Sequence, residues 1–222
     1  MSRPLLESAG GEVLSLEDYY ADFKENFAAA GEFWKLERGQ EFAEPGNASW
    51  EAFNHGDWQE AMRLLEEQRA DLIDYHSKAA ARGLRAHRIR IVTLPLTPYL
   101  QWELNALKIR DETGGIIRVL KLEEISGLEE HGPLPEIYTM DDRVMYEAIY
   151  DENGVLENAR RFTDTELVRR CRDFIIDLWQ IGEPIGSFFR REVAHLPPAP
   201  SPGTAVRPDY LKVRGRPGPI RS

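Results

Sequence analysis

The chain has 222 residues, of which 42% are hydrophobic and 30% are charged, and its formal net charge is −10. This composition is typical of a globular protein and is too apolar for global disorder. The negative charge argues against direct binding of nucleic acid, because that affinity comes largely from neutralising phosphates. No apolar run is long enough to cross a membrane. The single cysteine excludes an internal disulfide, and the N-terminus lacks the apolar stretch of a signal peptide, so we expect a cytoplasmic protein.

A helical layer is predicted over residues 15–83, after a flexible segment at residues 1–14. Ser15 can cap a helix whose apolar side chains recur on one face. Residues 33–42, FWKLERGQEF, alternate in part and predict a strand that leads into a loop. Asp57 is the predicted N-cap of one long helix that runs to the end of the layer.

An α+β domain is predicted over residues 84–195. Its expected elements are a strand at 87–92, a helix at 97–110, a strand at 116–122, a hairpin at 143–150 and 155–162, and a helix at 164–181. Asn153 and Gly154 suit the tight turn of the hairpin, and Thr163 with Glu166 predicts a capping box for the last helix. The fold class is therefore α+β, with a mixed sheet of about five strands covered by helices and preceded by the N-terminal helical layer.

Residues 196–222 form a proline-rich basic tail. They hold seven of the fourteen prolines, with five basic residues and one acid. Proline stiffens a chain without building a core. Two interpretations stay open: a surface extension, or a docking segment that lies on the acidic body or on a neighbouring subunit, as in a homodimer.

Several kinds of chemistry have no motif in this chain. The five histidines are scattered without the spacing of a zinc helix, and one cysteine cannot build a thiolate site. Nucleophile elbows, phosphate-binding loops and dinucleotide fingerprints are also lacking. We expect neither a metal nor a cofactor. Cys171 lies on an apolar helical stripe and is expected in the core, and Asp141-Asp142 is expected to form a turn.

The segment RAHRIRIVTLPLTPYLQWEL, residues 85–104, is the best candidate for a site. Arg88 and Arg90 face the same side of a predicted strand, and two arginines do not stay in a dry core without anionic partners. The next helix adds Tyr99, Trp102 and Glu103. The candidate ligand-binding residues are Arg88, Arg90, Tyr99, Trp102, Glu103, Trp34 and Arg38. Three interpretations stay open: a packing seam with structural ion pairs, a ligand cleft, or a surface for a protein partner.

Four segments carry a resemblance to a known family: FWKLERGQEF, SWEAFNHGDWQEAMRLLEEQR, HRIRIVTLPLTPYLQWEL and LPEIYTMDDRVMYEAIYDENG. They resemble an actinobacterial family of uncharacterised proteins with a domain of unknown function. Its members, common in streptomycetes, are often encoded near helix-turn-helix regulators. The likeness covers residues 15–195. It implies a regulatory context and no particular reaction.

The order of predicted elements is also similar to one half of a phospholipase-D-like fold, whose catalytically dead relatives act as sensor domains of transcriptional regulators. The active enzymes carry H-x-K followed by an aspartate on a strand. The H-x-K of this chain, His76-Ser77-Lys78, lies in a predicted helix, and Gly83 stands at the position of the acid. This departure argues against phosphodiesterase activity.

Two functions are consistent with these features. The first is a non-catalytic cytoplasmic protein that binds a ligand or partner and acts with a transcriptional regulator. Its partner would be a helix-turn-helix protein or an anionic small molecule. The alternative is a small-molecule enzyme of specialised metabolism, in which Glu103 or another buried acid reacts while Arg88 and Arg90 hold an anionic substrate. A buried carboxylate beside the arginines in a pocket favours the enzyme, and a flat apolar patch favours the partner surface.

Overall fold

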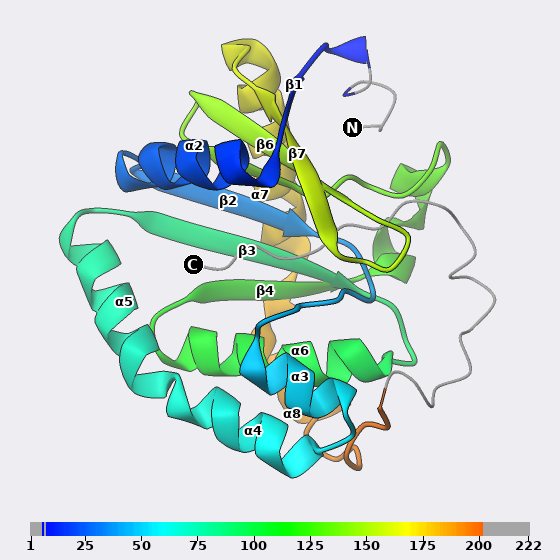
Figure 1. Cartoon of the computed structure of the whole chain (residues 1–222). Coiled ribbons are helices and arrows are strands. Elements are labelled where there is room, and N and C mark those ends of the chain that lie inside the picture. Colours follow the sequence, from blue (N-terminus) through cyan, green and yellow to red (C-terminus); the bar gives the residue numbers. More distant parts are fainter. Residues whose placement is uncertain (1–5, 7, 202–222) are drawn as a thin grey trace.

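The computed structural model describes residue 6 and residues 8–201 (Figure 1). Within this part of the chain, eight strands form one mixed sheet, covered by seven α-helices. The strands are β1 (Glu12–Leu14), β2 (Glu32–Glu37), β3 (Arg85–Val92), β4 (Ile116–Lys121), β5 (Ile137–Met140), β6 (Val144–Tyr150), β7 (Leu156–Phe162) and β8 (Glu183–Pro184). The helices are α2 (Leu16–Ala28), α3 (Ala48–Asn54), α4 (Trp58–Glu67), α5 (Arg69–Ala81), α6 (Pro98–Glu112), α7 (Thr165–Ile181) and α8 (Ile185–Glu192), with a 3-10 segment η1 (Leu122–Glu129).

The strand order across the sheet is β1-β7-β6-β5-β2-β3-β4-β8. Strands β2, β3 and β4 are parallel, because helices connect them and return the chain to the same end of the sheet. The remaining neighbours pair antiparallel. The α+β class is thus confirmed, and the expected number of about five strands is wrong. Strand β2 lies between β5 and β3, so residues 15–83 contribute a central strand as well as helices.

Most predicted elements are confirmed close to their expected bounds, because each carries a strong local signal. Thr97 caps α6 by accepting a hydrogen bond from the backbone N–H of Leu100. Gly154 takes the positive φ of 78° that the hairpin turn requires. The H-x-K motif lies inside α5, as expected.

Three local predictions are wrong. The long helix after Asp57 is divided into α4 and α5 at Gln68. The N-cap of α7 is Asp164 rather than Thr163, because the Asp164 carboxylate accepts the N–H of Leu167 at 2.8 Å. Residues 12–14, predicted to be flexible, form β1 and pair with β7. The strands that were not predicted, β1, β5 and β8, have only two to four residues, too few for a periodic pattern.

One face of the sheet is apolar and is covered by α7 (Figure 1). Leu36, Ile89 and Ile91 lie on this face and are fully buried. Cys171 of α7 packs against them, as predicted, and burial raises the pKa of its thiol to about 12. This face is an ordinary hydrophobic core.

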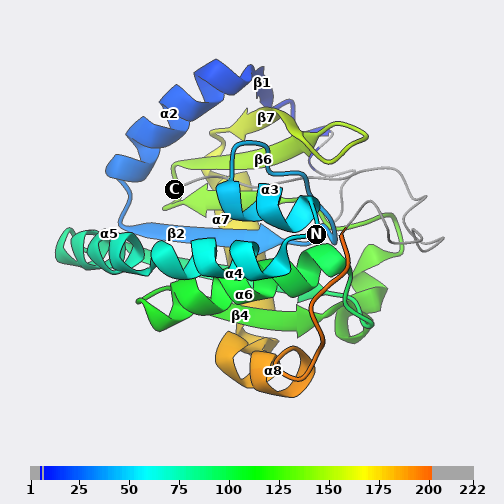
Figure 2. The ribbon, with the colours of Figure 1, turned by 60° about the horizontal axis from the view of Figure 1, so that its bottom comes forward.

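The opposite face is covered by two separate helices. Helix α2 packs near the β5–β7 side, where a cluster of tyrosines and phenylalanines fills the interface. Helix α6 covers β3 and β4 together with α8, and α3 and α4 form an outer layer on α6 (Figure 2). Between α2 and α6, β2 and β3 present charged residues to this face. The alternation that turns Leu36 and Ile89 toward α7 turns Lys35, Glu37 and Arg88 the other way.

The beginning of the predicted tail is described up to Ser201. Ala199 is buried in the cluster with α3 and α4, and the Ser201 hydroxyl donates to the Asn54 carbonyl at 2.7 Å. The rest of the tail, and the two interpretations of it, lie outside the described residues. In the described part of the chain, no helix combines the length and the apolarity needed to cross a membrane.

Candidate ligand-binding site

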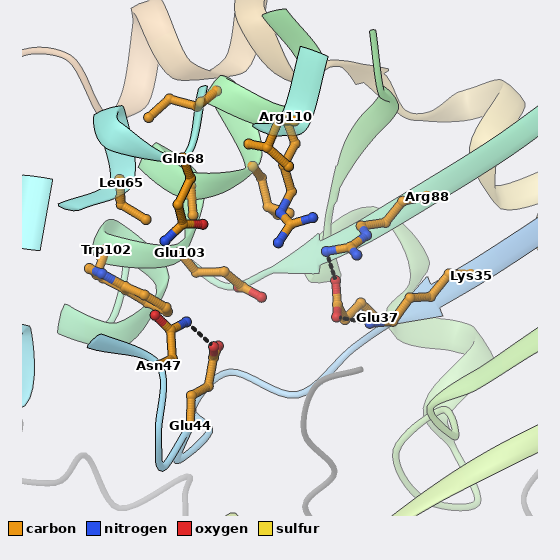
Figure 3. Close-up of a pocket in the computed structure, with 14 residues that line it drawn as sticks. Lys35, Glu37, Glu44, Asn47, Leu65, Gln68, Arg88, Trp102, Glu103 and Arg110 are labelled. Carbon is orange, nitrogen blue, oxygen red and sulfur yellow. Dashed lines mark hydrogen bonds and ion pairs between the residues drawn. The ribbon is translucent and has the colours of Figure 1, made fainter. Parts of the chain in front are cut away.

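A cavity of about 70 Å³ lies where the charged face of the sheet meets the helical layer (Figure 3). Strands β2 and β3 form one wall, α6 another, and α4, α5 and the loop after β2 close it. A cavity of this size holds a few water molecules or one small metabolite. The lining residues are Lys35, Glu37, Glu44, Asn47, Leu65, Gln68, Leu72, Arg88, Trp102, Glu103, Ala106, Leu107, Ile109 and Arg110.

The strand wall carries one carboxylate shared by two cations. Glu37 and Lys35 are almost completely buried and form an ion pair. The second oxygen of Glu37, Oε2, lies 3.1 Å from NH1 of Arg88. Burial opposes ionisation of Glu37, but the charges of Arg88, Lys35 and Arg90 outweigh it and lower its pKa to about 2. Glu37 is therefore a permanent anion that holds Lys35 and Arg88 in place.

Arg90 lies behind the cavity, and its Nε and Nη1 are bonded within the protein. Its Nε lies 2.7 Å from Oε2 of Glu103, and its NH1 donates to the carbonyls of Glu37 and Ile91. Its guanidinium also lies over the ring of Phe42, 5.6 Å from the centroid. This fully buried arginine is a structural ion-pair partner.

Glu103 connects this structural pair to the cavity, because its carboxyl group is turned into it (Figure 3). Burial raises the pKa of Glu103, the charge of Arg90 lowers it, and the negative charge of Glu37 raises it again, to about 7. A group with this pKa exchanges its proton near neutral pH. Burial also raises the pKa of nearby Glu136 to about 7, although the N–H groups of Arg38 and Gly39 donate to it.

The helix α6 adds a third basic group, Arg110, whose guanidinium points into the cavity on the same side as that of Arg88 (Figure 3). Burial, followed by the positive charge of Arg88, lowers the pKa of Arg110. An anion placed between the two guanidinium groups would offset the effect of Arg88 on Arg110 and accept hydrogen bonds from both.

An apolar wall completes the cavity. Trp102 stacks on Phe53 with ring centroids 5.9 Å apart, and its Nε1 donates to the Ser49 hydroxyl at 3.0 Å. Leu65 and Leu72 line the same side. The helical layer, through α3 and α4, therefore covers Trp102.

The structure brings together some of the predicted site residues. Arg88, Trp102 and Glu103 line the cavity. Arg88 and Arg90 lie on the same side of β3, as predicted, and both reach carboxylates. Tyr99 and Arg90 stand behind the lining; the Tyr99 hydroxyl donates to Glu44 at 2.8 Å.

Two predicted site residues lie elsewhere. Trp34 is on the α7 face of the sheet, where it stacks on His87 with ring centroids 4.0 Å apart and meets Trp179 edge-on. It therefore lies on the opposite side of the sheet from the cavity. Arg38 follows β2 and pairs with Glu129 at 2.7 Å, away from the cavity lining.

Four charged lining residues were not predicted from the sequence: Lys35, Glu37, Glu44 and Arg110. For three of them a signal exists. Lys35 and Glu37 alternate in FWKLERGQEF as the arginines do in β3, and Arg110 follows Glu103 by two helical turns. Glu44 lies in a loop with no periodic pattern. Among residues 6 and 8–201, no three His, Cys, Asp or Glu side chains are grouped so that they could hold a metal ion.

Comparison with known proteins gives a family for this chain. A family model described as Domain of unknown function (DUF6879) matches residues 21–190. A comparison with curated proteins finds no match. The matched range includes every residue that lines the cavity. Because the match extends over most of its length, the chain belongs to the DUF6879 family.

Proposed function

We propose that this protein is a cytoplasmic, non-catalytic binding protein whose cavity takes a small anionic ligand. One observation carries this proposal: the guanidinium groups of Arg88 and Arg110 point into one small buried cavity, next to Lys35 (Figure 3). Arginine binds carboxylate and phosphate oxygens in pairs, and such contacts strengthen where water is excluded.

The ionisation of the cavity wall supports an anion. Glu37 stays ionised but is shared between Lys35 and Arg88. Glu103, with a pKa of about 7, carries its proton in a large share of molecules at neutral pH. Positive charge therefore predominates around the cavity until an anion enters.

Isothermal titration calorimetry with acetate, propionate and inorganic phosphate tests this proposal. The expected result is binding to the full chain that Arg88→Gln weakens by roughly tenfold or more, because one bidentate contact is lost. Lys78→Gln is the matched control, since Lys78 is an exposed basic residue on the outer helix α5. Equal affinity in the wild-type protein and Arg88→Gln would contradict the proposal, and so would the absence of binding by every anion.

The partner in this proposal is a transcriptional regulator. The support comes from the resemblance to actinobacterial proteins that are encoded near helix-turn-helix regulators. A pull-down of the regulator encoded beside this gene, with and without ligand, tests it. Capture that depends on Arg88 is expected, and capture that the ligand and Arg88→Gln leave unchanged would contradict a ligand-dependent partnership.

A second candidate function is catalysis on an anionic small molecule, favoured by the buried Glu103 with its pKa of about 7. A carboxylate poised near neutral pH can act as a general base. In this alternative Arg88 and Arg110 hold the substrate. Glu103→Gln would then keep ligand affinity but abolish turnover, which NMR of the incubated ligand would detect.

A further inference from the structure

The cavity wall divides its charges between two sides (Figure 3). The guanidinium groups of Arg88 and Arg110 lie on one side. The carboxyl groups of Glu103 and Glu44 lie on the other, with the amide of Asn47. In all, three basic and three acidic side chains line the cavity: Lys35, Arg88, Arg110, Glu37, Glu44 and Glu103.

The outer carboxylate on the acidic side, Glu44, feels the charge of Arg110 but forms no direct ion pair with a described residue. Glu44 accepts hydrogen bonds from two neutral groups, the Asn47 amide at 2.7 Å and the Tyr99 hydroxyl at 2.8 Å. Within the part of the chain that the structure describes, no Lys, Arg or His nitrogen forms an ion pair with it. Burial raises the pKa of Glu44, and neither these two hydrogen bonds nor the charge of Arg110 outweighs it. A ligand cation placed here would gain a buried carboxylate as its partner.

The negative charge of Glu103 is also only partly neutralised by the protein. Its ion pair with Arg90 engages one oxygen, Oε2, while the carboxyl group also faces the cavity (Figure 3). The negative charges of Glu37 and Glu44 act on it from the strand and the loop. A cation between Glu44 and Glu103 would relieve this repulsion.

We infer that the ligand is a small zwitterion with a carboxylate and a protonated amine, of the amino-acid class. Its carboxylate would lie between Arg88 and Arg110, and its ammonium between Glu44 and Glu103. Trp102, Leu65 and Leu72 would contact the carbon skeleton. A zwitterion adds no net charge to the cavity, whereas a simple anion would engage Arg110 and leave Glu44 buried without an ion pair. This inference rests on the proposed function and specifies its ligand.

Matched probes separate the two halves of the site. Glycine, alanine, β-alanine and γ-aminobutyrate supply both charges. Acetate, propionate and butyrate lack the amine, and methylamine, ethylamine and propylamine lack the carboxylate. Calorimetry with the full chain should show one zwitterion that binds roughly tenfold more tightly than both of its counterparts, the factor that one modest ionic contact supplies.

Two variants assign that difference to the acidic side. Glu44→Gln should reduce the affinity of the zwitterion to that of its carboxylate counterpart and leave the counterpart unchanged. The Gln side chain keeps an acceptor for Tyr99. Glu67→Gln is the control, because Glu67 is an exposed acid on the outer face of α4. Circular dichroism and melting temperature establish that each variant is folded.

The outcomes separate this inference from the proposed function. If carboxylates bind as tightly as zwitterions and Arg88→Gln weakens both, the inference is overturned and the proposed function stands. The same holds if Glu44→Gln changes no affinity. If Arg88→Gln leaves the affinity of every probe unchanged, or if no probe binds, both are overturned.

Discussion

The two faces of the central sheet differ in what β2 and β3 bury. On the α7 face, Leu36, Ile89 and Ile91 pack among apolar neighbours. On the opposite face, the same two strands bury Lys35, Glu37 and Arg90. Both sets are equally inaccessible to water, yet burial stabilises the first set and costs free energy for the second unless its charges are paired.

The apolar face therefore stabilises the fold, whereas burial of the charged face costs free energy that the rest of the fold must offset. Replacing a buried ion pair by apolar residues of similar volume is often neutral or stabilising. Six charged side chains line the small cavity beside this face, and the proposed ligand would give them a role beyond folding.

The largest effect is expected for Arg90→Ala. It removes the partner of Glu103 from a fully buried site. Unfolding in urea should show a loss of about 3 to 5 kcal/mol, because Glu103 and the carbonyls of Glu37 and Ile91 lose their buried partner. Arg85→Ala on the same strand is the control, because its ion pair with Glu32 is exposed and should contribute less than about 1 kcal/mol.

The double variant Arg90→Met with Glu103→Leu sharpens this prediction. Removing both charges should restore most of the stability that Arg90→Ala loses, because no charge is left unpaired. A double variant as unstable as the single one would mean that this pair is required for the fold itself.

Leu36→Ala, on the apolar face, should cost about 3 kcal/mol through lost contacts and a cavity. Ligand affinity should remain unchanged, since Leu36 faces α7 and does not line the ligand cavity. Urea unfolding and calorimetry on the same sample measure both quantities. A parallel loss of affinity would show that the two faces are coupled.

The pH dependence of stability should also identify the charged face. Burial raises the folded-state pKa of Glu103 and Glu136 to about 7 from an ordinary 4.5. Between these values the folded state holds more protons than the unfolded state, so stability should fall as pH rises from about 4.5 to 7. Glu136→Gln should reduce this fall by the order of 1 to 3 kcal/mol. Glu37, with its lowered pKa, acts in the opposite sense and contributes stability that is lost as pH falls from 4.5 to about 2.

Urea unfolding from pH 4 to 8 measures this effect as the difference between the wild-type protein and Glu136→Gln. Identical slopes for the two proteins would show that Glu136 titrates at its ordinary value. An increase in stability between pH 5 and 7 that is lost in the variant would reverse the sign and contradict the account.

The smallest effect is expected for Trp102→Phe. The variant loses the hydrogen bond from Nε1 to the Ser49 hydroxyl, but that hydroxyl keeps its bond to the Ala61 carbonyl. The cost should be about 1 to 2 kcal/mol. A near-ultraviolet circular dichroism signal confirms that the stacking partner Phe53 stays packed. A loss of stability as large as that of Arg90→Ala would show that Trp102 is a main core residue and contradict its assignment to the cavity wall.

Much of this fold could be predicted from the sequence because its signals are local. Residues 87–92 and 97–110 follow from alternation and from the Thr97-Pro98 helix start. The same alternation predicts that the side chains of Arg88 and Arg90 lie on one side of their strand. The position of β2 inside the sheet could not be predicted, because pairing with β3 and β5 is a tertiary property that no short pattern encodes.

The site could be predicted only in part for the same reason. Arg88 and Glu103 come from neighbouring elements, whereas Glu44 reaches the cavity from the loop after β2. The Gln40 side chain holds that loop to the end of β3 by bonding the Ile91 carbonyl and the Thr93 N–H. The position of this loop depends on long-range hydrogen bonds. The sequence pattern around Gln40 does not distinguish the loop from an exposed turn.

Native mass spectrometry of the protein purified from its natural host tests the central claim most directly. The wild-type chain should carry a small molecule, and Arg88→Gln purified in the same way should not. Leu36→Val, a conservative change on the opposite face, should retain it. A wild-type chain and an Arg88→Gln chain with the same adduct, or with none, would contradict the claim that the charged face of the sheet is kept for a ligand.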